Sequence, residues 1–300
     1  MNRNRWVASA VLLCCLALAA CADGGLKSSP CPVTAFTIDQ DGGLGSYDIY
    51  RTSVPCEFRQ LTAGQGSSVS PAWSPDGHTL AFVSDRDGSA GAYVMNAVDG
   101  DGVRRLALAA DLRNSRPAWS PDGAFLAFAA ARSGNVDPYV LDVSGGGSPK
   151  RLTTHPGHDF APAWSPDGRH LAFTVVWNAG SRSDLYVMDT DGANQRRLTA
   201  SPGQDRSPAW SPDGSRIAFV RVSGGMEEIF VRDADGTPST ELSLGSGDMP
   251  AWSSDGKSLA LSDAVRGGRE IFVIEADGTG RRQYWIKGAS DENDPAFHPG

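Results

Sequence analysis

Residues 70–77 read SPAWSPDG, and four later segments repeat this pattern with small changes. They are RPAWSPDG (116–123), APAWSPDG (161–168), SPAWSPDG (207–214) and MPAWSSDG (249–256). Their tryptophans, Trp73, Trp119, Trp164, Trp210 and Trp252, follow one another at intervals of 46, 45, 46 and 42 residues. A motif that recurs at nearly constant spacing indicates an array of similar structural units.

Each copy of the motif begins a unit of four predicted strands, which we name a to d. Strand a contains the tryptophan, and strand b is an apolar run such as LAFV (80–83). A polar loop leads to strand c, such as YVMD (186–189), and an Asp/Gly turn leads to strand d, such as RLT (197–199). Short runs of apolar, β-branched and aromatic residues are typical of strands, and Ser-Pro-Asp-Gly suits a type I turn. Four antiparallel strands in a repeat of this length are typical of a β-propeller blade.

The two ends of the chain together supply a sixth blade. Residues 294–300 (DPAFHPG) resemble strand a, with Phe in the tryptophan position. Residues 33–38 (VTAFTI), 47–51 (YDIYR) and 58–62 (FRQLT) resemble strands b, c and d. Pairing these segments would satisfy the strand edges that an open ring exposes. The sequence therefore predicts an all-β fold, a six-bladed β-propeller of four-stranded antiparallel blades whose first blade is closed by the C-terminal strand.

The composition agrees with this prediction and excludes several classes of protein. The 35 glycines and 19 prolines among 300 residues exceed average usage and favour a turn-rich fold. Hydrophobic residues make up 40% of the chain, enough to bury a core, and a net charge of −8 argues against nucleic acid as a partner. Five cysteines are too few for a disulfide-built scaffold. The regularly placed tryptophans are expected to pack between blades rather than to stack on carbohydrate.

The N-terminal segment indicates export and lipid attachment. Two arginines within residues 1–6 precede the apolar run 7–20, which is shorter than the about 20 residues of a membrane-spanning helix and is typical of a signal peptide. The stretch 18–21 (LAAC) resembles the lipobox of bacterial lipoproteins. The resemblance implies cleavage before Cys21 and acylation of this cysteine, for example with palmitate. The alternative is an ordinary signal peptide with a chance cysteine.

These features divide the chain into a signal peptide (1–20), a lipidated cysteine with a flexible tether (21–32) and the propeller (33–300). We expect an exported protein, anchored in the lipid bilayer of the cell membrane or outer membrane through Cys21 and facing the periplasm or the exterior. A disulfide between Cys31 and Cys56 is also expected, because both flank strands of the first blade on one side and export permits oxidation. It would contribute about 3.5 kcal/mol in the chain-entropy model.

The repeated pattern P-x-W-S-P-D-G, followed by (I/L)-A-F, (I/L)-Y-V-M-D and R-L-T, resembles the WD-like repeats of TolB-type six-bladed propellers. The resemblance covers about residues 33–300. It is specific for the fold and says little about function, because propellers support many activities. TolB itself has an α/β domain before its propeller and is soluble in the periplasm. Here a tether and a predicted anchor precede the first strand, so the resemblance implies a TolB-like lipoprotein.

Function is expected where the repeats differ. In propellers the d–a and b–c loops share one face, and in this chain only those loops vary; variable loops on a rigid scaffold are where binding usually occurs. Mixed charge and one loop tryptophan favour a protein or peptide of the cell envelope as partner. The alternative is a solvated rim without a specific ligand. The predicted binding face consists of Arg86, Arg116, Arg132, His158, Asp159, Trp177, Asp205, Arg206, Asp248, Glu292 and Asp294.

Catalysis finds less support in the sequence. The chain has no G-x-S-x-G nucleophile motif and no glycine-rich phosphate loop before a helix, so we predict a non-enzymatic platform without a cofactor. The alternative is an envelope enzyme of the lyase or lactonase type with its active site at the channel mouth. His155, His158 and Asp159 could begin a zinc site, but Pro-Gly separates the histidines and no third histidine is placed nearby, so no metal is expected.

Overall fold

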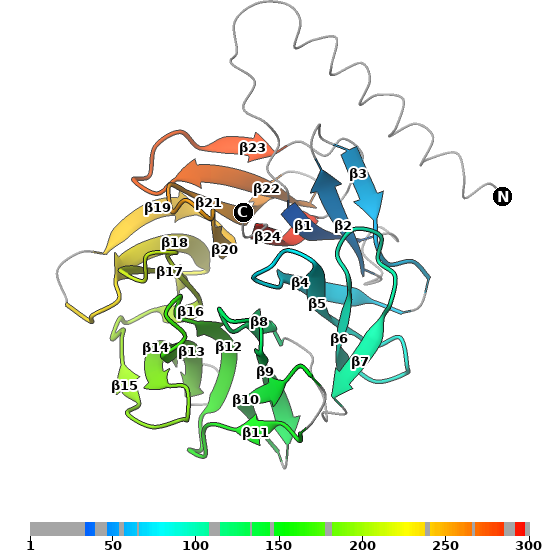
Figure 1. Ribbon diagram of the computed structural model, residues 1–300. Coiled ribbons are helices and arrows are strands. Elements are labelled where there is room, and N and C mark those ends of the chain that lie inside the picture. The colour runs from blue at the N-terminus through cyan, green and yellow to red at the C-terminus, as the bar shows by residue number, and fades with distance from the viewer. Residues whose placement is uncertain are drawn as a thin grey trace, which may run out of the picture.

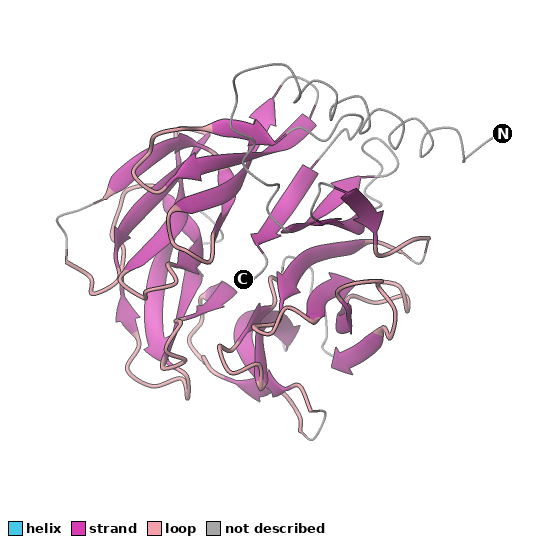
Figure 2. Ribbon diagram, turned by 45° about the horizontal axis from the view of Figure 1, so that its top comes forward, coloured by secondary structure: helices cyan, strands magenta, loops and turns pink. Residues whose placement is uncertain are grey.

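The computed structural model describes residues 34–39, 47–53, 57–64, 66–107, 115–132, 134–144, 147–177, 182–237, 241–265, 268–284 and 292–297. They form six four-stranded sheets, which are arranged like blades around a central axis (Figure 1). Only strands and loops occur in these ranges (Figure 2), and a helix that could cross a bilayer is absent from them. The predicted fold class, an all-β six-bladed propeller, is confirmed.

Each blade runs from an inner strand a to an outer strand d. Blade 1 consists of β24 (Glu292–Phe297), β1 (Thr34–Asp39), β2 (Tyr47–Ser53) and β3 (Glu57–Gln60). Blade 2 consists of β4 (Ser68–Trp73), β5 (Thr79–Ser84), β6 (Gly91–Asn96) and β7 (Arg104–Ala107). Blade 3 consists of β8 (Ala118–Trp119), β9 (Phe125–Arg132), β10 (Asn135–Asp142) and β11 (Lys150–Arg151).

The remaining three blades follow the same order. Blade 4 consists of β12 (His158–Trp164), β13 (His170–Trp177), β14 (Arg182–Asp189) and β15 (Arg196–Arg197). Blade 5 consists of β16 (Gln204–Trp210), β17 (Arg216–Ser223), β18 (Met226–Asp233) and β19 (Leu242–Ser246). Blade 6 consists of β20 (Asp248–Trp252), β21 (Ser258–Val265), β22 (Gly268–Glu275) and β23 (Arg282–Tyr284).

The C-terminal strand closes the first blade, as predicted. β24 pairs antiparallel with β1, and this places Thr34 opposite Phe297 and Ala35 opposite Ala296. The inner edge of β1 is therefore hydrogen-bonded, and the ring closes by joining segments from opposite ends of the chain.

The tryptophans link neighbouring blades. The indole Nε1 of Trp210 donates a hydrogen bond to the backbone carbonyl of Ala163 in the preceding blade, at 3.2 Å. Trp73, Trp119, Trp164 and Trp252 make the same bond to the preceding strand a at 3.0–3.1 Å. At the sixth junction Phe297 occupies this position and has no side-chain donor. The indole groups thus serve packing and bonding between blades, as the sequence analysis expected.

The a–b turns are alike in the five blades that carry the tryptophan motif. The Ser165 hydroxyl donates to Asp167 Oδ1 at 2.5 Å, and Asp167 also accepts the backbone amide of Arg169 at 3.0 Å. These hydrogen bonds lower the pKa of the Asp167 carboxyl below its ordinary value. The aspartates of the other four motifs, Asp76, Asp122, Asp213 and Asp255, also bond the motif serine and the amide two residues on. These carboxylates therefore hold turns together.

Four inner strands contain a strained residue just before the motif proline. Ser70, Ala161, Ser207 and Met249 have φ angles of 50° to 58°, a left-handed conformation that residues with a Cβ rarely adopt. The pairing with strand b shifts register at the same point in each of these blades. Such bulges change the direction of the neighbouring side chains. In this protein those side chains lie at one end of the inner strands.

Candidate functional site

A network of four charged residues occupies one mouth of the channel. The inner strands surround the central axis of the ring (Figure 1), and their N-terminal ends lie on the face formed by the d–a and b–c loops; we call the centre of this face the channel mouth. Two residues predicted from the sequence, Arg206 on β16 and Asp248 at the start of β20, lie there. They are joined by Glu227 on β18 and Arg269 on β22. We name these four residues the channel-mouth network.

Each guanidinium of the network contacts both carboxylates. Arg206 Nη1 lies 2.7 Å from Asp248 Oδ1, and Arg206 Nη2 lies 2.8 Å from Glu227 Oε1. Arg269 Nη2 lies 2.7 Å from Glu227 Oε2, and its Nη1 lies 3.6 Å from Asp248 Oδ2. Arg206 and Glu227 belong to blade 5, whereas Asp248 and Arg269 belong to blade 6. The network therefore joins the two blades at the channel mouth.

The buried Asp248 carboxyl remains an anion because cations surround it. Burial alone would raise its pKa, but the charges of Arg116, Arg206 and Arg269 outweigh burial and hold the pKa below its ordinary value. Arg116 precedes β8 in blade 3, three blades away from Asp248 around the ring. Its charge therefore acts across the channel, so three predicted residues, Arg116, Arg206 and Asp248, share one electrostatic site.

Asp205 belongs to a different cluster, within blade 5. Its side chain is fully buried, and Arg221 donates to both of its oxygens, at 2.7 and 3.0 Å. The Ser201 hydroxyl lies 3.0 Å from each oxygen, and Arg221 also pairs with Glu241. The charge of this carboxylate is therefore compensated within blade 5, at the start of strand a.

Asp159 occupies the same strand position in blade 4, with different surroundings. It is fully buried, and neither of its oxygens has a hydrogen-bond partner among the described residues. His155 Nε2 lies 3.1 Å from Asp159 Oδ2 without the alignment of a hydrogen bond. Burial raises the pKa of the Asp159 carboxyl to about 8. A carboxyl group in this state is protonated at neutral pH.

The predicted residue Trp177 contacts His155, whereas the predicted residue His158 bonds the neighbouring blade. The Trp177 ring stacks on His155 with 5.3 Å between ring centroids. His158 Nδ1 accepts the backbone amide of Val136 in blade 3 at 3.2 Å. The two histidines thus point to different partners. No group of three His, Cys, Asp or Glu side chains suited to a metal occurs in the described part of the chain.

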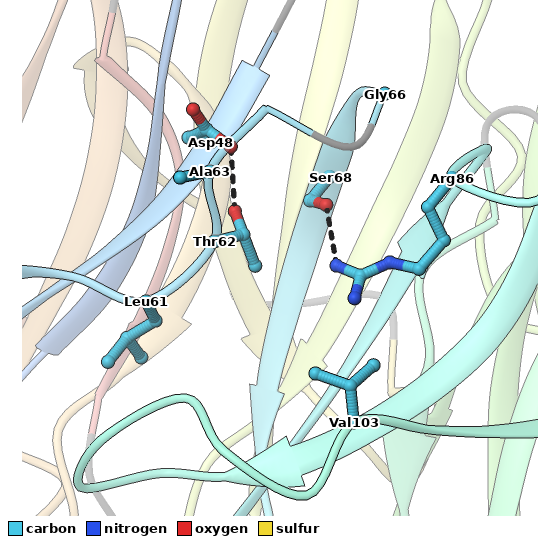
Figure 3. Close-up of a pocket in the computed structure, with 8 residues that line it drawn as sticks. All are labelled: Asp48, Leu61, Thr62, Ala63, Gly66, Ser68, Arg86 and Val103. Atoms are coloured by element: carbon cyan, nitrogen blue, oxygen red, sulfur yellow. Dashed lines mark hydrogen bonds between the residues drawn. The ribbon is translucent and has the colours of Figure 1, made fainter.

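Arg86 lies at a third place, in the b–c loop of blade 2. It lines a cavity between blades 1 and 2 together with Asp48, Thr62 and Ser68 (Figure 3). The structure therefore distributes the predicted residues over the channel mouth and three inter-strand or inter-blade clusters, and does not gather them into one patch.

The remaining predicted residues are only partly described or not described. Arg132 lies on β9, and Glu292 and Asp294 lie on β24, but their side chains are outside the described part of the structure. Cys21, Cys31 and Cys56 lie outside the described residues altogether. Glu227 and Arg269 were not predicted from the sequence, because they look like ordinary polar residues at the start of strand c. Their only signal is charge beside a b–c loop that varies between blades.

Comparison with known proteins gives a family. A family model described as the TolB beta propeller domain matches residues 104–176 and 176–300. Among solved structures, TolB from Acinetobacter baumannii is 22% identical, with a TM-score of 0.77 over 90% of this chain and 67% of that chain. A putative TolB from Agrobacterium tumefaciens is 21% identical, with a TM-score of 0.65 over 85% of this chain and 89% of that chain. No curated protein sequence matches.

An enzyme shares the same architecture. Oligogalacturonate lyase from Vibrio parahaemolyticus is 14% identical, with a TM-score of 0.59 over 85% of this chain and 78% of that chain. At such identities a structural likeness shows the fold alone. The fold defines the chain as a six-bladed β-propeller. Because the family model covers more than half of its residues, the protein belongs to the TolB β-propeller family.

Proposed function

We propose that this protein is a non-enzymatic binding platform of the cell envelope, lipid-anchored through Cys21, which holds a protein or peptide partner over the channel mouth. The observation that supports binding at this place is the channel-mouth network. It presents charges of both signs on the face where the repeats differ. The opposite face, by contrast, repeats turns whose aspartates are engaged with their own motif serines and amides.

The network is suited to recognition because three of its four charged side chains are held in place and are also partly exposed. The side chains of Arg206, Arg269 and Glu227 are 29%, 27% and 33% exposed, while their mutual ion pairs hold them in place. A partner that binds there need not immobilise long flexible side chains, which lowers the entropic cost of association. Arginines held in this way are frequent at the energetic centres of interfaces.

An exposed apolar residue adjoins the network. Met226, next to Glu227 in the tight turn between β17 and β18, has an exposed fraction of 66%. Methionine and arginine are both enriched at protein interfaces relative to the rest of a protein surface. The proposed partner therefore combines an apolar side chain for Met226 with charged groups that complement the network.

Binding is favoured over catalysis by the state of the central carboxyl. An acid–base catalyst that works near neutral pH needs a pKa close to that pH. The pKa of Asp248 is instead held below its ordinary value by neighbouring arginines, so it acts as a constant negative charge. Asp159, whose pKa is raised to about 8, is fully buried away from a substrate.

Photo-cross-linking in the native envelope tests the proposed face. A photoreactive amino acid replaces Met226 in one variant and Val98 in another; Val98 is also exposed, at 53%, but lies in the c–d turn of blade 2 on the opposite face. We expect a specific adduct from position 226 only, and its yield should fall when Arg206→Ala is added. An adduct from position 98 alone, or a yield that ignores Arg206→Ala, would reject the proposed face.

The anchor and the disulfide are tested separately. Cys21→Ser should move the protein from the membrane fraction to the soluble fraction and abolish incorporation of a labelled fatty acid. If the variant keeps the label, acylation at Cys21 is wrong. Alkylation of the mature protein before and after reduction should reveal two additional thiols only after reduction, since we propose that Cys31 and Cys56 form a disulfide; two free thiols before reduction would contradict this.

A further inference from the structure

Two hydrogen bonds fasten the b–c hairpin of blade 3 to the start of blade 4, where β10 and β12 lie side by side (Figure 1). Asn135 Nδ2 donates to the backbone carbonyl of His155 at 3.0 Å. The backbone amide of Val136 donates to Nδ1 of His158, the first residue of β12, at 3.2 Å. The His155 ring is stacked on Trp177 of β13. We name the two hydrogen bonds the hairpin contact.

The bond to His158 requires a neutral imidazole. A ring nitrogen accepts a hydrogen bond only while it carries no proton, and both ring nitrogens are donors in the cationic form. His158 therefore carries its single proton on Nε2. A second proton on Nδ1 would set two N–H groups against each other, that of the ring and that of Val136, and the bond would be lost. Histidine is the side chain whose charge ordinarily changes between pH 5 and pH 8.

The His158 ring is open to solvent. Its side chain is exposed, and its nearest aromatic neighbour is Phe160, with 6.3 Å between ring centroids. Among the described residues, no charged side chain lies within ion-pair distance of His158, so the Val136 amide is the polar group that faces it from β10. A proton from solvent thus reaches this nitrogen without displacing an ion pair.

The neighbouring His155 resists protonation. Burial lowers the pKa of its imidazole; the charge of Asp137 opposes this change and that of Arg151 adds to it. Its Nε2 lies 3.1 Å from Asp159 Oδ2, and that carboxyl keeps its proton below a pKa of about 8. Mild acid therefore acts on the hairpin contact through His158, while His155 stays packed against blade 4.

Blade 5 carries a side chain that does not titrate at this position. His158 pairs with Val176 in the register of strands a and b, and Gln204 pairs with Val222 in the same register of blade 5. An amide side chain can accept a hydrogen bond without changing its charge. The histidine of blade 4 therefore adds a response to pH that the strand itself does not require.

We propose that the hairpin contact is a pH-operated latch, closed while His158 is neutral and opened when its imidazole takes up a proton. Opening leaves the b–c hairpin of blade 3 held to blade 4 by the Asn135 bond alone. Arg132, which pairs with Asn135 across this hairpin, belongs to the predicted binding face, so that part of the face would respond to acid. The latch is a contact within the chain and does not depend on the proposed partner.

Amide hydrogen exchange of the mature protein, read by NMR at pH 7 and pH 5, tests the latch. After correction for the intrinsic effect of pH, the protection factor of the Val136 amide should fall at least about fivefold at pH 5, the worth of one hydrogen bond. The Leu185 amide, which donates to the Thr199 hydroxyl at 3.0 Å, is the internal control and should not lose protection. Constant or increased protection of Val136 at pH 5 would overturn the proposal.

A change in global stability cannot imitate this result. The buried Asp159 carboxyl, with its pKa raised to about 8, makes the folded state more stable at pH 5 than at pH 7. Global unfolding would therefore increase the protection of every amide at pH 5, whereas the latch lowers that of Val136.

Two substitutions assign the effect to His158. In His158→Asn an amide oxygen replaces Nδ1 as acceptor and does not titrate, so Val136 should be equally protected at both pH values. His78→Asn, in an exposed a–b turn on the opposite face, is the matched control and should lose protection at Val136 as the wild type does. A loss in His158→Asn equal to that of the wild type would overturn the latch. The imidazole ¹⁵N spectrum of the wild type is a second readout, and a proton on Nδ1 of His158 at pH 7 would refute the contact even if the variant fails to fold.

Discussion

Replacement of Asp159 by asparagine is expected to remove a pH dependence from the stability of the propeller. The Asp159 carboxyl is fully buried, and its oxygens lack hydrogen-bond partners among the described residues. Burial is the largest influence on the pKa of this carboxyl; the Thr153 hydroxyl and the charge of Arg151 lower the pKa, and the charge of Asp137 raises it. Burial therefore raises its pKa from an ordinary value of 3.8 to about 8.

The direction and size of the effect follow from this shift. Between the two pKa values the folded state holds a proton that the unfolded state has lost, so wild-type stability falls as pH rises. The slope is about 1.4 kcal/mol per pH unit, which gives about 2.7 kcal/mol between pH 5 and pH 7. Asparagine does not titrate. The free energy of unfolding of Asp159→Asn, relative to the wild type, should therefore rise by about 2.7 kcal/mol over this interval.

Urea unfolding at pH 5, 6 and 7 measures the free energy of unfolding of Asp159→Asn and of the wild type. Asp205→Asn is the matched control, because Asp205 holds the same strand position in blade 5. Asp205 accepts two hydrogen bonds from Arg221, so its replacement leaves a partly buried cation short of a partner. We expect it to destabilise the protein by about 3 kcal/mol at each pH. The reasoning fails if the stability difference between Asp159→Asn and the wild type is the same at pH 5 and pH 7, since Asp159 would then be ionised in the folded protein.

Three further substitutions test the repeat architecture by the same urea assay. Trp210→Phe removes the indole bond to the Ala163 carbonyl and should lower the free energy of unfolding by about 1–2 kcal/mol; an unchanged value would show that the bond adds nothing. Ser165→Ala removes the hydroxyl that donates to Asp167 and accepts the backbone amide of His170, so the free energy of unfolding should fall by about 1 kcal/mol. A rise would contradict the role assigned to the turn. Met249→Gly relieves a φ angle of 58° and should raise stability by about 0.5–1 kcal/mol; a loss would mean that the strain is compensated by side-chain packing.

The sequence was sufficient for the ring and its closure. Five copies of one motif at regular spacing define five inner strands, and the residues at the two chain ends match the strands of one more unit. Each assignment depends on local features, namely alternating apolar runs and turn residues with fixed conformational preferences. The pairing of β24 with β1 follows because an all-β ring must satisfy its strand edges.

The candidate site could be predicted only in part. Arg206 and Asp248 were identified because they stand just before the motif, where the loops vary. Glu227 and Arg269 were not, because charged residues at the start of strand c have no distinctive local pattern. Their role depends on ion pairs within and between blades 5 and 6, at distances of 2.7–3.6 Å that no periodicity encodes.

Local sequence patterns thus fix the backbone: the number of blades, the order of their strands and the turns that join them. The partner of each charged side chain depends on how the blades pack. Asp159 and Asp205 hold the same position in their repeats, yet the first is a buried acid whose oxygens lack hydrogen bonds from the described residues and the second is a compensated anion. The physical reason is that the repeat fixes where a Cα atom lies, whereas charge and burial depend on the side chains that neighbouring strands and blades bring within a few ångströms.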